Sequence, residues 1–178
     1  MIGGDDLSDG LLAQRRVMIG GVLGPAAVSA AVAQLLLLGG QGDDPVEVVI
    51  NSPGGSLEDA VSLLDTLRSM RAALTIDVLG QARGSAAVVV AASPGRRRIG
   101  ATASVSLRLD GPPPHTGQET AEDLLRLAGL AEDLERRVAT VVAGRSGQST
   151  GWVLDQFERG RVMFGSEAVD AGLVDEIR

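Results

Sequence analysis

The sequence predicts an α/β fold in which parallel strands alternate with helices within one domain. Short segments rich in β-branched residues alternate along the chain with helical patterns, which is typical of parallel crossover units. The length of 178 residues suits a single hydrophobic core. Hydrophobic residues make up 44% of the chain but only three residues are aromatic, so aliphatic side chains must build that core.

Strands are predicted where β-branched residues are bounded by glycine, proline or aspartate. These segments lie at residues 17–19, 46–51, 74–79, 104–109 and 173–177. The arginines at residues 96–98, between two of these segments, are predicted to form a solvated turn. Because helices separate the strands, right-handed crossover connections are expected.

Helices are predicted at residues 25–38, 57–70, 85–92 and 120–143. The first begins at Pro25, which suits a first helical turn, and the second follows Ser56, which has Asp59 three positions later as in a capping box. The third is short, small and apolar, which indicates a buried helix. The fourth is too long for a simple crossover, and its apolar stripe fits either a surface helix packed on its own sheet or a projecting oligomerisation arm.

The composition excludes several kinds of chemistry. The chain contains no cysteine, no tyrosine and no lysine, and its single histidine is His115. Thiol nucleophiles, disulfides, Schiff-base lysines and multi-histidine zinc sites are therefore excluded, and no metal or other cofactor is expected. The net charge of −7 also argues against nucleic acid as a partner, because binding phosphates requires a basic face.

The N-terminal region predicts a cytoplasmic protein without a membrane partner. The first ten positions carry Asp5, Asp6 and Asp9, where a signal peptide would carry positive charge. The apolar run at residues 30–38 is too short to span a bilayer. We expect one domain over residues 1–178, with a short tail at residues 1–10.

The most informative segment is the turn Asn-Ser-Pro-Gly-Gly-Ser at residues 51–56. It follows a predicted strand and opens a predicted helix, so the backbone N–H groups of Gly54 and Gly55 lie where a helix N-terminus adds positive potential. This geometry can hold an oxyanion. Taken alone, such a turn is more often only a tight connection between two elements.

The stretch VEVVINSPGGSLEDAVSLLDTL resembles the hallmark segment of the Clp protease proteolytic subunit (ClpP) family, which are serine endopeptidases. The similarity extends from LLAQRRVMIGG near the start to AVDAGLVDEI near the end. It implies a β-α spiral subunit of the crotonase-like superfold, assembled in heptameric rings that stack through a long handle helix. The region at residues 118–143 falls at the handle, and the implied partners are further copies of this chain or an active paralogue.

The family's catalytic triad does not map onto suitable residues. The family motif G-Q-A-A-S-M-G-A places the nucleophilic serine in the column of Gly84, with Ser85 one position later. The base column falls on Leu109, or on Arg108 if one residue is deleted, and the acid column falls on Gly160. None of these side chains can act as nucleophile, base or acid, so the sequence predicts that triad chemistry is lost.

Three side chains near these columns are alternative candidates. Ser85 is a candidate displaced nucleophile, although a shift of one residue at a helix start turns a side chain by about 100°. Arg83 would either pair with a peptide carboxylate or block the vacated site. His115 lies in a proline-rich loop near the handle, where it is expected to be solvated.

The leading interpretation is a catalytically inactive, structural or regulatory ring subunit that keeps the oxyanion turn of Gly54 and Gly55 and can still meet a peptide. The family's unfoldase docks on aromatic residues that correspond here to Glu47 and Val49, so direct docking of an unfoldase is not expected. Two alternatives stay open: an active serine peptidase that uses Ser85 in a rearranged site, and a crotonase-like acyl-CoA enzyme.

Overall fold

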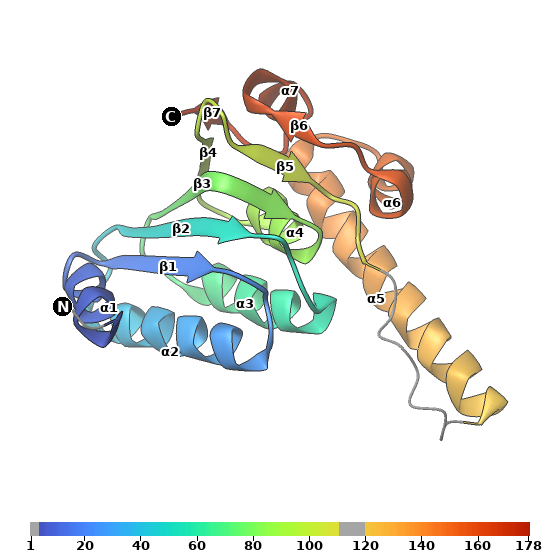
Figure 1. Ribbon diagram of the computed structural model, residues 1–178, viewed down its shortest axis with the longest axis horizontal. Coiled ribbons are helices and arrows are strands. Elements are labelled where there is room, and N and C mark those ends of the chain that lie inside the picture. The colour runs from blue at the N-terminus through green and yellow to red at the C-terminus, as the bar shows by residue number, and fades with distance from the viewer. Residues whose placement is uncertain (1–3, 111–119) are drawn as a thin grey trace.

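The computed structural model describes residues 4–110 and 120–178, and its centre is a mostly parallel sheet (Figure 1). The chain begins with α1 (Gly4–Ala13), β1 (Arg16–Gly20), α2 (Pro25–Gln41), β2 (Val46–Ser52), α3 (Leu57–Ser69) and β3 (Leu74–Arg83). It continues with α4 (Ser85–Ala92), β4 (Arg96–Ile99), β5 (Ser104–Ser106), α5 (Ala121–Ser146), α6 (Thr150–Arg159), β6 (Met163–Phe164), α7 (Gly165–Asp170) and β7 (Glu176–Ile177).

The sheet confirms the predicted α/β class with parallel strands. Five strands lie in the order β1-β2-β3-β4-β7, and each neighbouring pair is parallel. The first part of β3 pairs with β4, whereas its last three residues pair with β5. Between these two parts lies Gly80, which has a φ of +93°. The chain therefore changes neighbours within one strand, and β5 with its antiparallel partner β6 leaves the main sheet.

Helix α4 forms the centre of the core. All eight of its residues are buried, and they are only Ala, Val and Ser. It packs against α3, α5 and β3. Because neighbouring elements approach this helix from several directions, small side chains are required along its whole length. The prediction of a buried helix at residues 85–92 is confirmed.

Helix α5 is buried only over its second half. Its buried residues are Val138, Ala139, Val142 and Ala143. Towards its start, Leu125, Leu127 and Leu130 are 76%, 45% and 57% exposed. The first half extends away from the sheet (Figure 1), as a projecting helix does. No helix among the described residues combines the length and the apolar character needed to cross a bilayer.

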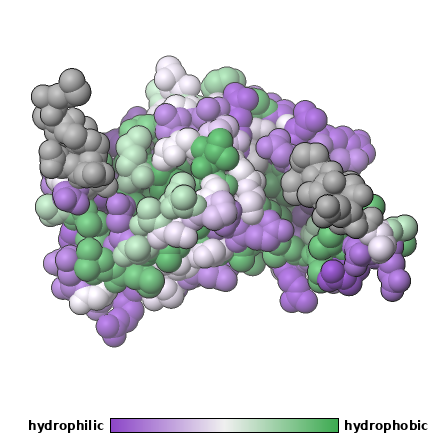
Figure 2. Space-filling model, turned by 60° about the horizontal axis from the view of Figure 1, so that its bottom comes forward, coloured by the Kyte–Doolittle hydropathy of each residue, from purple (hydrophilic) through white to green (hydrophobic). Residues whose placement is uncertain are grey.

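Other apolar side chains are exposed on α2. Leu36 and Leu37 are 59% and 52% exposed, although Leu35 and Leu38 beside them are fully buried. The face that carries α2 and α3 shows apolar patches among polar surface (Figure 2). The helix is therefore apolar on more than the side that packs on the sheet.

The predicted solvated turn at residues 96–98 is wrong, because these arginines form strand β4. Arg97 is 2% exposed, and its guanidinium pairs with Asp175 at 2.5 Å and donates to the Ala91 carbonyl at 2.8 Å. Arg98 pairs with Asp77 at 2.6 Å. The carboxylates that compensate these buried cations come from segments distant in the sequence, so the local pattern of three arginines could not indicate a strand.

The remaining differences concern the ends of elements. The strand predicted at residues 104–109 ends at Ser106, and the one predicted at residues 173–177 is reduced to Glu176–Ile177. Helix α1 occupies Gly4–Ala13, within and just beyond the segment expected to be a tail. Helix α6 and the short elements β6 and α7 carried no predicted assignment.

Asp77 is the buried carboxylate of a charge cluster on this sheet. Its side chain is 1% exposed and pairs with Arg98 at 2.6 Å and with Arg178 at 2.9 Å. Burial acts to raise the pKa of Asp77, but the hydrogen bonds and charges of its partners outweigh burial and hold that pKa below its ordinary value. Asp77 therefore stabilises the fold at pH values above the pKa of the unfolded carboxyl, and this contribution disappears as the pH falls through the folded pKa.

Replacing Asp77 with Asn is expected to lower the free energy of unfolding by about 2–3 kcal/mol at pH 7, because Arg98 loses a charged partner. The difference from the wild type should shrink below about pH 4, where the unfolded carboxyl becomes protonated. Urea unfolding at pH 7 and pH 3 measures both values. Asp65→Asn, at an exposed position of α3, is the control. A difference that grows on acidification would contradict the assignment.

Candidate functional site

The turn after β2 can be built only with glycine at two positions. Gly54 has a φ of +101°, and a Cβ there would lie 2.6 Å from the Arg83 carbonyl oxygen. A Cβ on Gly55 would lie 2.0 Å from the Leu23 carbonyl oxygen. Both distances are far below van der Waals contact, so the two glycines let three backbone segments meet.

Hydrogen bonds fix this turn in place. The Gly54 N–H donates to Ser52 Oγ at 3.1 Å, and the Gly54 carbonyl accepts from the Leu23 N–H at 2.8 Å. The Ser56 N–H donates to the Leu23 carbonyl at 3.1 Å, while Ser56 Oγ caps α3 by accepting from the Asp59 N–H. The predicted capping residue of this helix is therefore confirmed.

A second sharp turn joins β3 to α4, and Gly84 is its only residue. Gly84 has φ 52° and ψ −126°, and its N–H donates to the Ser106 carbonyl at 2.8 Å. This backbone conformation is strained for any residue with a Cβ. A strained strand-to-helix turn is also the place from which hydrolases of other folds present a nucleophilic serine. Here the turn carries no side chain.

Ser85 follows at the first position of α4 and is 1% exposed. Its hydroxyl donates to the Gly55 carbonyl at 3.1 Å. The position for a Cβ on Gly54 lies 3.4 Å from the Ser85 backbone nitrogen, so the glycine turn and the start of α4 are in direct contact. Gly54 and Gly55 therefore lie beside the start of this helix.

The structure brings Gly84, Arg108 and Gly160 together. A Cβ on Gly84 would lie 3.2 Å from the Arg108 carbonyl oxygen, and a Cβ on Gly160 would lie 3.0 Å from the Arg108 nitrogen. The Arg108 side chain is exposed. Leu109 packs partly against the core, and its N–H donates to the Phe157 carbonyl at 2.9 Å. The backbone of Arg108 thus lies between the other two positions, which are 76 residues apart in the sequence.

The remaining candidates have no catalytic partner in the part of the chain that the structure describes. The Arg83 side chain is exposed, and no described residue forms an ion pair with it. His115 lies outside the described residues. No group of three acidic or histidine side chains within residues 4–110 and 120–178 is placed to hold a metal ion.

Comparison with known proteins identifies the family of this chain. The family model described as Clp protease matches residues 4–178. The chain belongs to the Clp protease family. It is 32% identical over 171 residues to the "ATP-dependent Clp protease proteolytic subunit 1" of Rhodococcus jostii, covering 94% of this chain and 76% of that protein.

Two further proteins named as Clp protease subunits or subunit-like proteins are also similar to this chain. The "Putative ATP-dependent Clp protease proteolytic subunit-like" protein of Streptomyces coelicolor is 34% identical over 170 residues, covering 94% of this chain and 80% of that protein. The "ATP-dependent Clp protease proteolytic subunit 4" of Rhodococcus jostii is 28% identical over 174 residues, covering 97% of this chain and 88% of that protein.

Glu47 and Val49 lie two residues apart in the regular part of β2, so they point to the same face of the strand in this Clp protease homologue. Glu47 pairs with Arg16 at 2.6 Å, with Arg98 at 3.4 Å and with Arg178 at 3.6 Å. Together with Asp77, these residues form a charge cluster over β1, β2, β3 and β4. Val49 is 6% exposed. The sequence did not predict this cluster, because Glu47 was considered alone and the arginines of β4 were expected to be solvated.

Ser85→Ala tests the structural role of the hydroxyl. The Gly55 carbonyl would lose its buried donor, so the free energy of unfolding should fall by about 1–2 kcal/mol. Ser62→Ala, at an exposed position of α3, is the matched control and should change stability little. Chemical denaturation of the two variants beside the wild type gives the comparison. Equal stability of Ser85→Ala and the wild type would show that this hydrogen bond contributes nothing.

Proposed function

We propose that this chain is a non-cleaving subunit of a Clp-type proteolytic ring, with a structural or regulatory role beside an active paralogue. The single observation that carries this proposal is Gly84, which occupies the strained turn between β3 and α4 and offers no nucleophile. Hydrolysis of a peptide bond at neutral pH needs an activated nucleophile as well as oxyanion donors. Here Gly84 supplies no such nucleophile, and the Gly54 N–H of the glycine turn already donates to Ser52 Oγ.

The neighbouring positions support the same proposal. Next to Gly84 lies Arg108, whose guanidinium stays protonated at neutral pH and cannot accept a proton. Leu109 and Gly160 carry no ionisable group. None of these three side chains can therefore act as the base of a catalytic triad or orient such a base.

Ser85 is a poor substitute for the missing nucleophile. Its hydroxyl is buried and its proton is donated to the Gly55 carbonyl, which is not a base that could activate it. An attacking oxygen must also reach a substrate carbonyl, and the 1% exposure of Ser85 leaves no room for one. A peptide lying along the glycine turn would therefore be bound without being cut.

A role within a ring agrees with the exposed apolar residues of α5. Leu125, Leu127 and Leu130 are exposed on a helix that leaves the core, and such a stripe is stable in water when another surface covers it. Two relatives of this chain from Rhodococcus jostii are numbered as subunits 1 and 4, so one organism holds several such proteins. We infer assembly with a paralogue or with further copies of this chain, in stacked rings.

Direct docking of an unfoldase on this subunit is not part of the proposal. Docking onto an apolar pocket would require aromatic or aliphatic residues on this face of β2, whereas Glu47 there is held by Arg16, Arg98 and Arg178. Displacing these ion pairs for an apolar contact would leave partly buried charges without partners. An unfoldase would then engage the active paralogue instead.

The chemical part of the proposal is tested on the purified chain with a fluorophosphonate probe and a fluorogenic peptide. We expect no covalent labelling and no turnover above the background rate, with Ser85→Ala indistinguishable from the wild type. Gly84→Ser alone should also stay inactive, because triad residues act as a unit. Labelling or hydrolysis that disappears in Ser85→Ala would overturn the proposal and identify Ser85 as a nucleophile.

The assembly part is tested by the double variant Leu125→Arg with Leu130→Arg. Light scattering of the wild type at micromolar concentration should give a mass well above the monomer mass of 18.2 kDa. The double variant should assemble at least tenfold more weakly, because two exposed apolar contacts become charged. Arg126→Gln, at an exposed position between them, should assemble as the wild type does. A monomeric wild type, alone and with an active paralogue, would contradict the proposal.

A further inference from the structure

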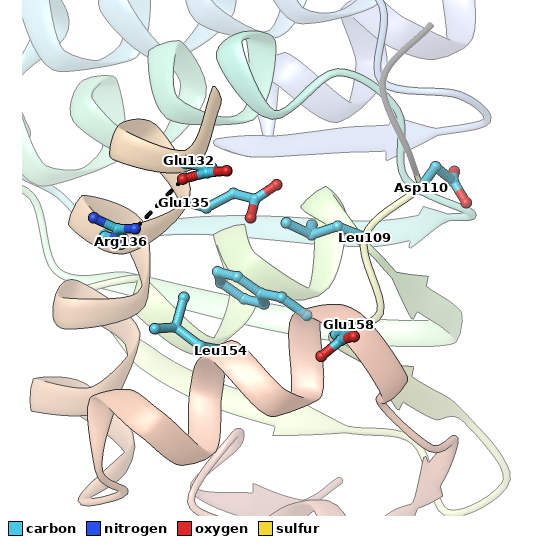
Figure 3. Close-up of a pocket in the computed structure, with 8 residues that line it drawn as sticks. Leu109, Asp110, Glu132, Glu135, Arg136, Leu154 and Glu158 are labelled. Carbon is cyan, nitrogen blue, oxygen red and sulfur yellow. Dashed lines mark hydrogen bonds and ion pairs between the residues drawn. The ribbon is translucent and has the colours of Figure 1, made fainter. Parts of the chain in front are cut away.

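A pocket of about 370 Å³ lies beside the Gly84 site, between α5, α6 and the segment that follows β5 (Figure 3). Its floor is apolar: Phe157 is 4% exposed, and Leu109 and Leu154 pack partly against the core. Pockets of this size are suited to a small organic group or to one or two side chains of a peptide.

The rim of this pocket is strongly acidic. Four carboxylates line it, and Arg136 is the one cation among the lining residues; the carboxylates belong to Asp110, Glu132, Glu135 and Glu158. Arg136 already pairs with Glu132 at 3.4 Å. Glu158 pairs with Arg159, which is outside the pocket lining, at 3.6 Å. Asp110 and Glu135 therefore face the pocket without a lining cation of their own.

Glu135 experiences this excess of negative charge directly. Its carboxylate extends from α5 toward Leu109 across the pocket (Figure 3). Partial burial raises the pKa of Glu135, and the nearby charge of Glu132 raises it further. Both effects disfavour the ionised form of Glu135, and a cation bound in the pocket would stabilise it.

The pocket adjoins the site described above. Leu109 forms part of the floor and directly follows Arg108, whose backbone lies between Gly84 and Gly160. The Leu109 N–H donates to the carbonyl of Phe157, which ties the two floor residues together. The pocket and the backbone around Gly84 and Gly160 are therefore joined through the neighbouring residues Leu109 and Arg108.

We propose that this pocket binds the cationic side chain of a polypeptide, with arginine as the best fit. The methylene groups of the arginine side chain would lie on Leu154, Phe157 and Leu109, and the guanidinium would reach the carboxylates of the rim. The carboxylates surround the pocket without three of them converging as metal ligands in the described part of the chain, which suits an extended organic cation better than an ion. The proposal rests on the proposed function only in placing a bound, uncut peptide next to the pocket.

The experiment compares two capped peptides that differ only in charge: acetyl-Ala-Leu-Arg-amide and the same peptide with citrulline in place of arginine. Calorimetric titration of the full chain should show at least tenfold tighter binding of the arginine peptide. In the double variant Glu132→Gln with Glu135→Gln, this ratio should fall below about threefold.

A matched control separates the pocket from the general charge of the protein. Glu122→Gln with Asp133→Asn removes the same two charges from exposed positions of α5 that do not line the pocket. This control should keep the tenfold ratio, because long-range interactions between exposed charges are screened by salt. Circular dichroism of both double variants checks that α5 is intact.

Three results would overturn the proposal: equal binding of the two peptides, no binding of either peptide at millimolar concentration, or the same loss of the ratio in the control variant. These results are independent of the test of the proposed function. Covalent labelling of Ser85 would overturn the non-cleaving role and leave the arginine preference intact, whereas loss of the preference would leave the absence of labelling intact.

Discussion

The close approach of three backbone segments at Gly54 and Gly55 is the constraint on which the rest of the site depends. Side chains at these positions would lie 2.6 Å from Arg83 and 2.0 Å from Leu23, so the loop after β1, the turn after β2 and the end of β3 can meet only here. The hydroxyl of Ser85 then joins the start of α4 to the same turn. Once these contacts form, the positions of α4 and of the strained Gly84 are fixed.

The glycine turn is therefore required by packing whether or not the protein performs chemistry. The pair of glycines that could hold an oxyanion also lets the segments after β1 and β2 and the end of β3 approach closely. Their presence in a sequence is consistent with catalysis but does not depend on it. At Gly84 the close packing is weaker, because a Cβ would meet only the Arg108 carbonyl oxygen, at 3.2 Å, so the absence of a side chain there is the more informative feature for function.

The sequence predicted the features that depend on local patterns. The limits of α4 were predicted because eight small apolar residues between two turns leave few alternatives, and the Ser56 cap was predicted from its spacing to Asp59. Prediction from the sequence was wrong where contacts between residues distant in the sequence determine the structure. Arg97 and Arg98 are strand residues only because Asp175 and Asp77 neutralise them from distant elements, and the direction of the Ser85 hydroxyl depends on a carbonyl thirty residues earlier. The acidic pocket needed three separate segments to converge, so no spacing in the sequence indicated it.

Gly160 shows why an acidic side chain would be difficult to place at this position of the fold. A Cβ there would lie 2.3 Å from the Gln156 carbonyl oxygen and 3.0 Å from the Arg108 nitrogen. The Gly160 N–H donates to that same Gln156 carbonyl at 2.8 Å and ends α6. An aspartate at position 160 would therefore have to displace the end of α6. Phe157, whose carbonyl accepts a hydrogen bond from the Leu109 N–H, would move with it. The end of α6, the pocket floor and the segment after β5 are thus packed around Gly160. Introducing an acidic side chain at this position would require all three to move together.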